Sequence, residues 1–244
     1  MQRWPLLVMA MVYPTILSWA YFVALAQNQS PEALIAPSAG AINPAVVWTY
    51  TAGKIFQFAL PLWWAWRVKR LRVQFALPQS KGVGIGVTFS LIAGAGAFVI
   101  YQFLRDHSQL DRTAEQIRHK IQEFGLETPA AYLFFAVFLV VVHSFLEEYY
   151  WRWFLFRALQ ERVRLGPAIL FSSLAFMAHH VVILGVFFPG RFWQMTLPLS
   201  LGVGIGGAFW AWLYNQSGSL YPSWLSHLLI DAAIMAVGYE MLFG

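Results

Sequence analysis

The sequence contains no cysteine and few charged residues, and both shortages narrow the class of protein. Without cysteine there is no disulfide framework, no thiol nucleophile and no Cys-ligated metal site. Charged residues make up 11% of the 244 residues, whereas a soluble domain has about a quarter. Hydrophobic residues make up 59%, and the mean hydropathy is +0.57. We therefore expect an all-α, polytopic membrane protein that forms a single integral membrane domain over residues 1–244.

Seven apolar stretches are long enough to cross a bilayer as helices, which takes about 20 residues each. They cover residues 4–26, 44–66, 82–104, 129–156, 167–189, 195–214 and 222–243. The segment 105–127 is mixed in charge and carries apolar residues along one helical stripe. This pattern predicts an amphipathic helix that lies along the membrane interface.

Two features of the chain bear on its placement in the membrane. The first span ends in Ala24-Leu25-Ala26, which resembles a signal-peptide cleavage site. Its apolar stretch is longer than the usual h-region of about 7–15 residues, so we expect an uncleaved anchor. With the N-terminus inside, the inner loops hold nine Lys and Arg residues and the outer loops five. The positive-inside rule therefore favours a cytoplasmic N-terminus, and we expect a bacterial cell membrane.

Small residues predict close packing of some of these helices. Gly82 and Gly86 are four residues apart, as are Gly202 and Gly206. This spacing places two glycines on one helix face, where a neighbouring helix can approach closely. Helix packing is the function that we assign to all four.

Ionisable residues interrupt the apolar spans at a few positions. Glu147 and Glu148 follow a nearly uninterrupted apolar run, and Arg152 comes four residues later. An ionisable side chain at membrane depth costs at least about 2.5–3.5 kcal/mol on insertion scales, which makes it a functional-site hypothesis. Glu148 and Arg152 share a helix face and can pair, while Glu147 lies about 100° around the helix. The structural alternative is a buried ion pair that holds helices together.

Histidines and one aspartate supply further polar groups at depth. His179 and His180 lie midway along the fifth span, and His227 and Asp231 share a face of the seventh. Each polar group needs a partner in a medium without water. The arrangement of lowest cost gathers them around one polar cavity, which we expect to open towards the cytoplasmic side.

Three motifs in this set carry a resemblance to a known family. Residues 147–152 read Glu-Glu-Tyr-Tyr-Trp-Arg and fit EExxxR, residues 176–180 fit FxxxH, and residues 227–231 fit HxxxN/D. In this order on three membrane helices they resemble the CPBP intramembrane proteases. That family includes type II CAAX prenyl endopeptidases and bacteriocin-processing or immunity proteins of the Abi-like type. The resemblance implies a catalytic core over 128–244, preceded by N-terminal spans and the interfacial helix in 1–127.

The resemblance implies a glutamate-dependent endopeptidase that cuts near the cytoplasmic face. Glu147 would act as the general base, and His180 would help it to activate a water molecule. His227 and Asp231 would stabilise the oxyanion, whereas Glu148 and Arg152 would shape and orient the site. The substrate class it implies is a peptide or a prenylated protein tail of the CAAX type. No nucleic acid is expected as a partner, although membrane lipid is.

Several residue assignments stay open at this stage. Where some members carry asparagine this chain has Asp231, which cannot donate to an oxyanion when ionised but can accept from His227 and fix its tautomer. His180 is preferred over His179 because Phe176 precedes it by four residues. His143 lies one turn before Glu147 and can touch it.

The use of a metal also stays open. Two histidines and a glutamate are a familiar zinc set, but the sequence lacks HExxH. We therefore expect no cofactor, with zinc not excluded.

Two other functions compete with the endopeptidase. A non-catalytic immunity or scaffold protein of the same fold would use the polar cluster for packing or regulation. A transporter or proton relay would also line its path with acids and histidines. We see no internal repeat of the kind that transporters show, and this favours the enzyme over the transporter.

Overall fold

The structure is a computed structural model that describes residues 4–25, 44–69, 80–106, 114–115, 117–118, 121 and 126–244. All regular elements in these ranges are helices, which confirms the predicted all-α class. The predicted interfacial helix, residues 105–127, lies for the most part outside the described residues.

Six helices in the described ranges have the length and hydropathy to cross a membrane. They are Trp4–Val23, Val83–Arg105, Pro129–Gln160, Leu165–Phe187, Phe192–Ser217 and Leu220–Phe243. The second predicted span also folds as a helix, α2 (Pro44–Trp63), but it is not among the six. Lys54 and Gln57 lie in its middle and lower its mean hydropathy. The chain is an integral membrane protein of the polytopic helical type.

The chain divides into two compact units. Unit 1 comprises the described residues of Met1–Gln74 and Tyr150–Ala211, and unit 2 those of Phe75–Tyr149 and Trp212–Gly244. The helix Pro129–Gln160 and the helix α9 (Leu197–Ser217) each continue from one unit into the other.

Aromatic contacts and one buried hydrogen bond organise unit 1. It contains α1 (Trp4–Trp19) with its continuation η1 (Ala20–Leu25), α2 with η3 (Trp64–Lys69), α7 (Arg157–Gln160), α8 (Leu165–Phe187), and η6 (Phe192–Thr196), which leads into α9. Tyr150 donates from its hydroxyl to the carbonyl of Ala10 at 2.7 Å. Phe154 packs edge-on against Trp64. The helix that follows the glutamate pair is thereby fixed to α1 and η3.

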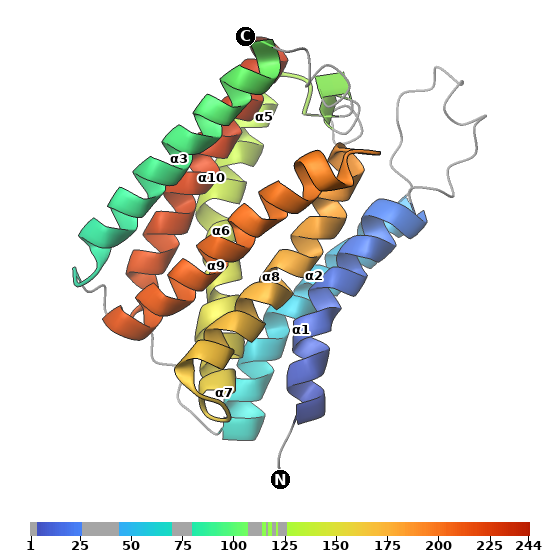
Figure 1. Ribbon diagram of the computed structural model, residues 1–244. Helices are drawn as coiled ribbons and strands as arrows, with labels where there is room; N and C mark the ends of the chain where they lie inside the picture. Colours follow the sequence, from blue (N-terminus) through green and yellow to red (C-terminus); the bar gives the residue numbers. More distant parts are fainter. Residues whose placement is uncertain are drawn as a thin grey trace. The chain divides into compact units, whose positions relative to one another are not determined.

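Close packing of two helices organises unit 2. The helices α3 (Val83–Asp106) and α10 (Leu220–Phe243) lie side by side along their lengths (Figure 1). A Cβ on Gly86 would lie 3.1 Å from the carbonyl oxygen of Pro222, and one on Gly94 would lie 3.1 Å from Cβ of Ala233. The hydroxyl of Ser90 lies 2.8 Å from both the hydroxyl and the carbonyl of Ser226. The predicted packing role of Gly86 is confirmed, and the contact fixes the part of α10 that carries His227.

Local capping sets where the helices of unit 2 begin. Thr128 caps α5 (Pro129–Val137) by accepting from the amide of Ala131 at 3.2 Å, and Pro129 occupies the first turn, where its missing N–H is harmless. Ser219 caps α10 by accepting from the amide of Tyr221 at 3.2 Å. Gly218, between α9 and α10, has a φ of 70°, a left-handed conformation that favours glycine.

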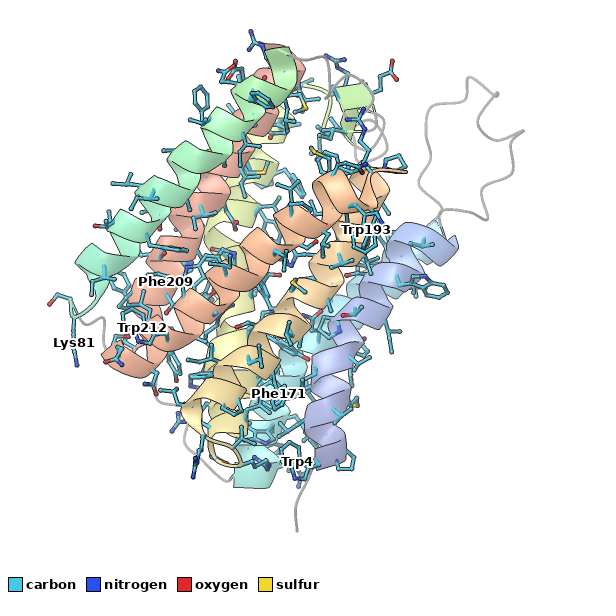
Figure 2. All side chains as sticks on the ribbon, in the orientation of Figure 1. Trp4, Lys81, Phe171, Trp193, Phe209 and Trp212 are labelled. Atoms are coloured by element: carbon cyan, nitrogen blue, oxygen red, sulfur yellow. The ribbon has the colours of Figure 1, made fainter. Side chains whose placement is uncertain are left out.

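The outward surfaces of the helices are apolar, as a lipid environment requires. On α3 the exposed side chains include Leu91, Ile92 and Val99. In unit 1, exposed tryptophans mark both ends of the helices: Trp4 at the start of α1 and Trp193 in η6 (Figure 2). Tryptophan is enriched at the two membrane–water interfaces, so these residues fit the two edges of a spanning unit.

Candidate active site

The two adjacent glutamates lie on a long helix whose winding alternates between α and π. This helix begins with α5, continues through the π-helical segment η4 (Phe138–His143), the α-helical turn α6 (Ser144–Glu148) and the π-helical segment η5 (Tyr149–Phe156), and ends with α7. Glu147 and Glu148 both belong to α6, and both are buried. Local π-winding within α-helices is frequently found at functional sites, and here it flanks the carboxylates on both sides.

His227 of α10 contacts the glutamate pair within unit 2. Its Nδ1 lies 2.9 Å from Oε1 of Glu148, and its Nε2 lies 3.7 Å from Oε2 of Glu147. The same Nε2 lies 3.6 Å from Oδ1 of Asp231, one turn further along α10. A single buried imidazole therefore faces three carboxylates from two helices.

His143 approaches Glu147 from the opposite side of its carboxylate. Its Nε2 lies 3.4 Å from Oε1 of Glu147, whereas His227 faces Oε2. The contact follows from the four-residue spacing, which brings two side chains together on a helix. The expectation that His143 can touch Glu147 is confirmed, and Glu147 has an imidazole at each oxygen.

Trp224 links the two helices one turn away from this cluster. Its indole N–H lies 3.1 Å from Oγ of Ser144 and 3.2 Å from the carbonyl oxygen of Val141. Trp224 precedes His227 by three residues, and Ser144 precedes Glu147 by three, so the link and the cluster share the same pair of helix faces. The π-helical turn shifts backbone carbonyls out of the α pattern, and the indole satisfies one of them.

The electrostatics of unit 2 concentrate negative charge around one imidazole. The carboxylates of Glu147, Glu148 and Asp231 all face His227, and His143 adds a second imidazole. Such a group can take a proton at a carboxylate and present an N–H from an imidazole, the two functions that hydrolysis of an amide needs. At low dielectric these interactions are stronger than in water.

Arg152 lies in an aromatic environment in unit 1. Its guanidinium carbon lies 4.7 Å from the ring centre of Phe176 and 5.0 Å from that of Trp210. Its Nη2 donates to the carbonyl of Gly207 at 3.3 Å. A Cβ on Gly207 would lie 3.1 Å from Cδ1 of Phe176, so the glycine lets α9 come close to α8 here. The two rings and this close approach hold a buried guanidinium in place.

The two adjacent histidines of α8 also lie in unit 1. The ring of His179 is parallel to that of Trp151, with 5.5 Å between the ring centres. His180 has its Nδ1 3.0 Å from the carbonyl oxygen of Phe176, and its ring centre lies 4.8 Å from that of Phe176. The contact of Phe176 with His180 matches the FxxxH spacing. His179 is buried with 3% of its surface exposed, whereas His180 is more open.

The structure therefore brings together four of the six predicted site residues. Glu147, Glu148, His227 and Asp231 form one cluster in unit 2, while Arg152 and His180 are placed within unit 1. Sequence reasoning overlooked Trp224 and Ser144, although each lies three residues before a predicted site residue. Within the part of the chain that the structure describes, no group of three or more His, Asp or Glu side chains has the arrangement of a metal site.

Comparison with known protein families gives a match over part of the chain. Residues 129–233 match the family model described as type II CAAX prenyl endopeptidase Rce1-like. The matched range begins at the first residue of α5 and ends within α10, so it includes all residues of the cluster in unit 2 as well as Arg152 and His180. No curated protein and no solved structure matches the chain.

Proposed function

We propose that this member of the CPBP intramembrane protease family, whose type II CAAX prenyl endopeptidase domain spans residues 129–233, hydrolyses a peptide bond with a water molecule activated by Glu147. The observation that carries the proposal is the buried carboxylate of Glu147 between two imidazoles, with one of them also bound to Glu148. Glu147 as the base, His227 as the proton donor and Glu148 as the acid that orients the donor then lie together on two neighbouring helices.

The reaction begins with a proton transfer to Glu147. The carboxylate takes a proton from water, and the water oxygen attacks the carbonyl carbon of the scissile bond. The tetrahedral intermediate collapses by breaking the C–N bond, and Glu147 returns the proton to the leaving amine. General base and acid catalysis of this kind contributes about 10²–10⁴-fold to the rate.

His227 is suited to stabilise the oxyanion of the intermediate. Its Nδ1 is 2.9 Å from Glu148, which fixes the orientation of the ring and leaves Nε2 on the side of Glu147. A donor preorganised at the position of the developing charge is often worth about 2.7–4 kcal/mol in the transition state. Asp231 adds a second carboxylate beside Nε2, at 3.6 Å, and can stabilise positive charge on the ring.

The family resemblance alone assigns roles to two polar residues of unit 1. It implies that His180 helps to activate the attacking water and that Arg152 shapes and orients the site. The proposed substrate is a peptide, of which a prenylated CAAX tail is the form that the family suggests. Cleavage near the cytoplasmic face, a cytoplasmic N-terminus and a bacterial cell membrane belong to the same proposal.

A cleavage assay on the purified protein in detergent tests the proposal. The substrates are a peptide library and one CAAX peptide made with and without its prenyl group. Glu147→Gln should reduce cleavage by at least about 10²-fold because it removes the base but keeps the size of the side chain. Glu161→Gln is the matched control, since Glu161 lies at the end of the same long helix, beside Arg162.

The outcomes separate the competing functions. Full cleavage by Glu147→Ala would exclude Glu147 as the base. Absence of cleavage by the wild type, combined with complementation of a gene deletion by Glu147→Gln, would favour the immunity or scaffold protein. Loss of activity with a chelator and its return with Zn²⁺ would assign a metal to the site.

A further inference from the structure

His143 holds a place at the glutamate pair that the proposed reaction has not used. It is the last residue of η4, and its Nε2 lies 3.4 Å from Oε1 of Glu147. The other oxygen, Oε2, lies 3.7 Å from Nε2 of His227 on α10. Each oxygen of one carboxylate thus faces a nitrogen from a different segment.

This arrangement restricts the terminal torsion of the Glu147 side chain. The terminal torsion of a glutamate side chain has broad, roughly two-fold preferences, so the carboxylate plane is poorly defined by its own rotamer. A contact at one oxygen alone leaves the plane free to turn about that contact. Contacts at both oxygens fix the plane and hence the direction in which the remaining lone pairs point.

We propose that His143 is a positioning residue, which holds the carboxylate plane of Glu147 in the orientation needed to accept a proton from water. The inference rests on the proposed function of Glu147 as the base. The distance of 3.4 Å between Nε2 and Oε1 exceeds a good hydrogen bond by a few tenths of an ångström. Catalytic hydrogen bonds are often long in the free enzyme and tighten when the substrate binds.

The surroundings of His143 favour this role over a packing role. Its neighbours Val141 and Val142 are exposed on the apolar outer face of η4. The side chain of His143 is 28% exposed, whereas that of Glu147 is 6% exposed. An apolar residue would satisfy such a position at lower cost, because a polar side chain in lipid is unfavourable. The imidazole therefore has a use in its contact with Glu147.

Three variants test the inference by kinetics on the full-length protein. His143→Ala removes the contact, and we expect kcat to fall by about 10- to 100-fold, as misplacement of a reacting group does, with KM within about twofold. His143→Gln places an amide N–H where Nε2 was, and should recover kcat to within about fivefold of the wild type. Val142→Ala, one residue away and exposed, is the control and should leave both constants unchanged.

Two kinetic results would overturn the inference. One is an unchanged kcat in His143→Ala. The other is a loss in His143→Gln as large as that in His143→Ala, with both variants folded. Because Glu147→Gln is assayed beside them, an active wild type with an inactive Glu147→Gln keeps the proposed function intact in either case.

A second measurement reports on the contact even if no peptide is cleaved. Thermal unfolding midpoints are measured for His143→Ala, Glu147→Ala and the double variant. Contacting residues give a combined effect that differs from the sum of the single effects. Additive shifts would show that the two side chains are not coupled and would overturn the inference independently of any activity.

Discussion

Nδ1 of His227 lies 2.9 Å from Oε1 of Glu148, and this polar contact joins α10 to the helix of the glutamate pair. Glu148 has no exposed surface, and His227 is 4% exposed. Removal of the imidazole from a buried carboxylate–imidazole contact destabilises the folded protein, because the carboxylate stays buried without that partner. The contact therefore serves both the fold of unit 2 and the orientation of the ring that we propose to stabilise the oxyanion.

Replacement of His227 distinguishes its contribution to the stability of the fold from its contribution to activity. We expect His227→Ala to destabilise the protein by about 3–5 kcal/mol, because it leaves the carboxylate of Glu148 buried without this imidazole. His227→Gln retains a donor and should lose less stability, while both variants lose cleavage. Thermal unfolding in detergent gives the first quantity, with Ile234→Ala, an exposed residue of the same helix, as the control. Equal midpoints for wild type and His227→Ala would contradict the expected burial cost.

Trp224 is predicted to position the cluster through its indole N–H. Trp224→Phe removes the donor to Ser144 and Val141 but keeps an aromatic ring beside Phe145. We expect a loss of about 0.5–1.5 kcal/mol in unfolding free energy, the net value of a typical hydrogen bond, together with a lower kcat. Trp193→Phe, at an exposed tryptophan in η6, should change neither. A variant at Trp224 with wild-type kcat would mean that the link has no influence on the cluster.

Two glycines of α3 give a matched pair for the packing against α10. Gly86→Ala brings a Cβ to 3.1 Å from the carbonyl oxygen of Pro222, a backbone atom that cannot turn away. Overpacking of this kind costs about 1–3 kcal/mol. Gly84→Ala is the control, since its added Cβ would have no described atom within 4 Å beyond its chain neighbours and the backbone of its own helix. The unfolding midpoint should fall for Gly86→Ala alone, and similar midpoints for both variants would show that α10 can move aside.

Arg152→Lys tests whether shape or charge matters in the aromatic environment of unit 1. Lysine keeps the charge but loses the flat guanidinium that lies near the rings of Phe176 and Trp210. We expect destabilisation of about 2 kcal/mol, the size of a desolvated cation–π contact. Arg157→Lys, on the exposed side of α7, serves as the control in the same thermal scan. Retention of the wild-type midpoint would show that charge alone suffices.

The sequence predicted the helices and most of the cluster because both follow from local patterns. Span length and hydropathy depend on composition, and α10 begins within two residues of the predicted start at 222. The four-residue spacings of His143 with Glu147 and of His227 with Asp231 hold because each pair lies on one helix. Gly86 also packs as its spacing indicated.

What the sequence left undetermined depends on contacts between helices and on winding. Hydrophobic periodicity carries no sign of the π-helical segments η4 and η5, because apolar residues lie on every face there. Sequence reasoning paired Asp231 with His227, and the structure adds a shorter contact to Glu148 that no spacing along one helix can predict. Gly202 was expected to pack against a neighbouring helix, and no described atom of another helix lies within 4 Å of its added Cβ. The division at residue 127 and the roles of all six predicted site residues, Arg152 and His180 among them, stay predictions.

The π-helical segment η4 sets the direction in which the glutamate pair points. A π turn takes one residue more than an α turn, and one residue corresponds to about 100° of rotation in an α-helix. Shortening Phe138–His143 by one residue would therefore swing Glu147 and Glu148 by more than a quarter of a circle relative to α5, which Tyr132 anchors to the carbonyl of Met235. The orientation of the carboxylates thus depends on the number of residues in η4. Deletion of one of the apolar residues 138–142 would turn the carboxylates away without altering any polar side chain of the site.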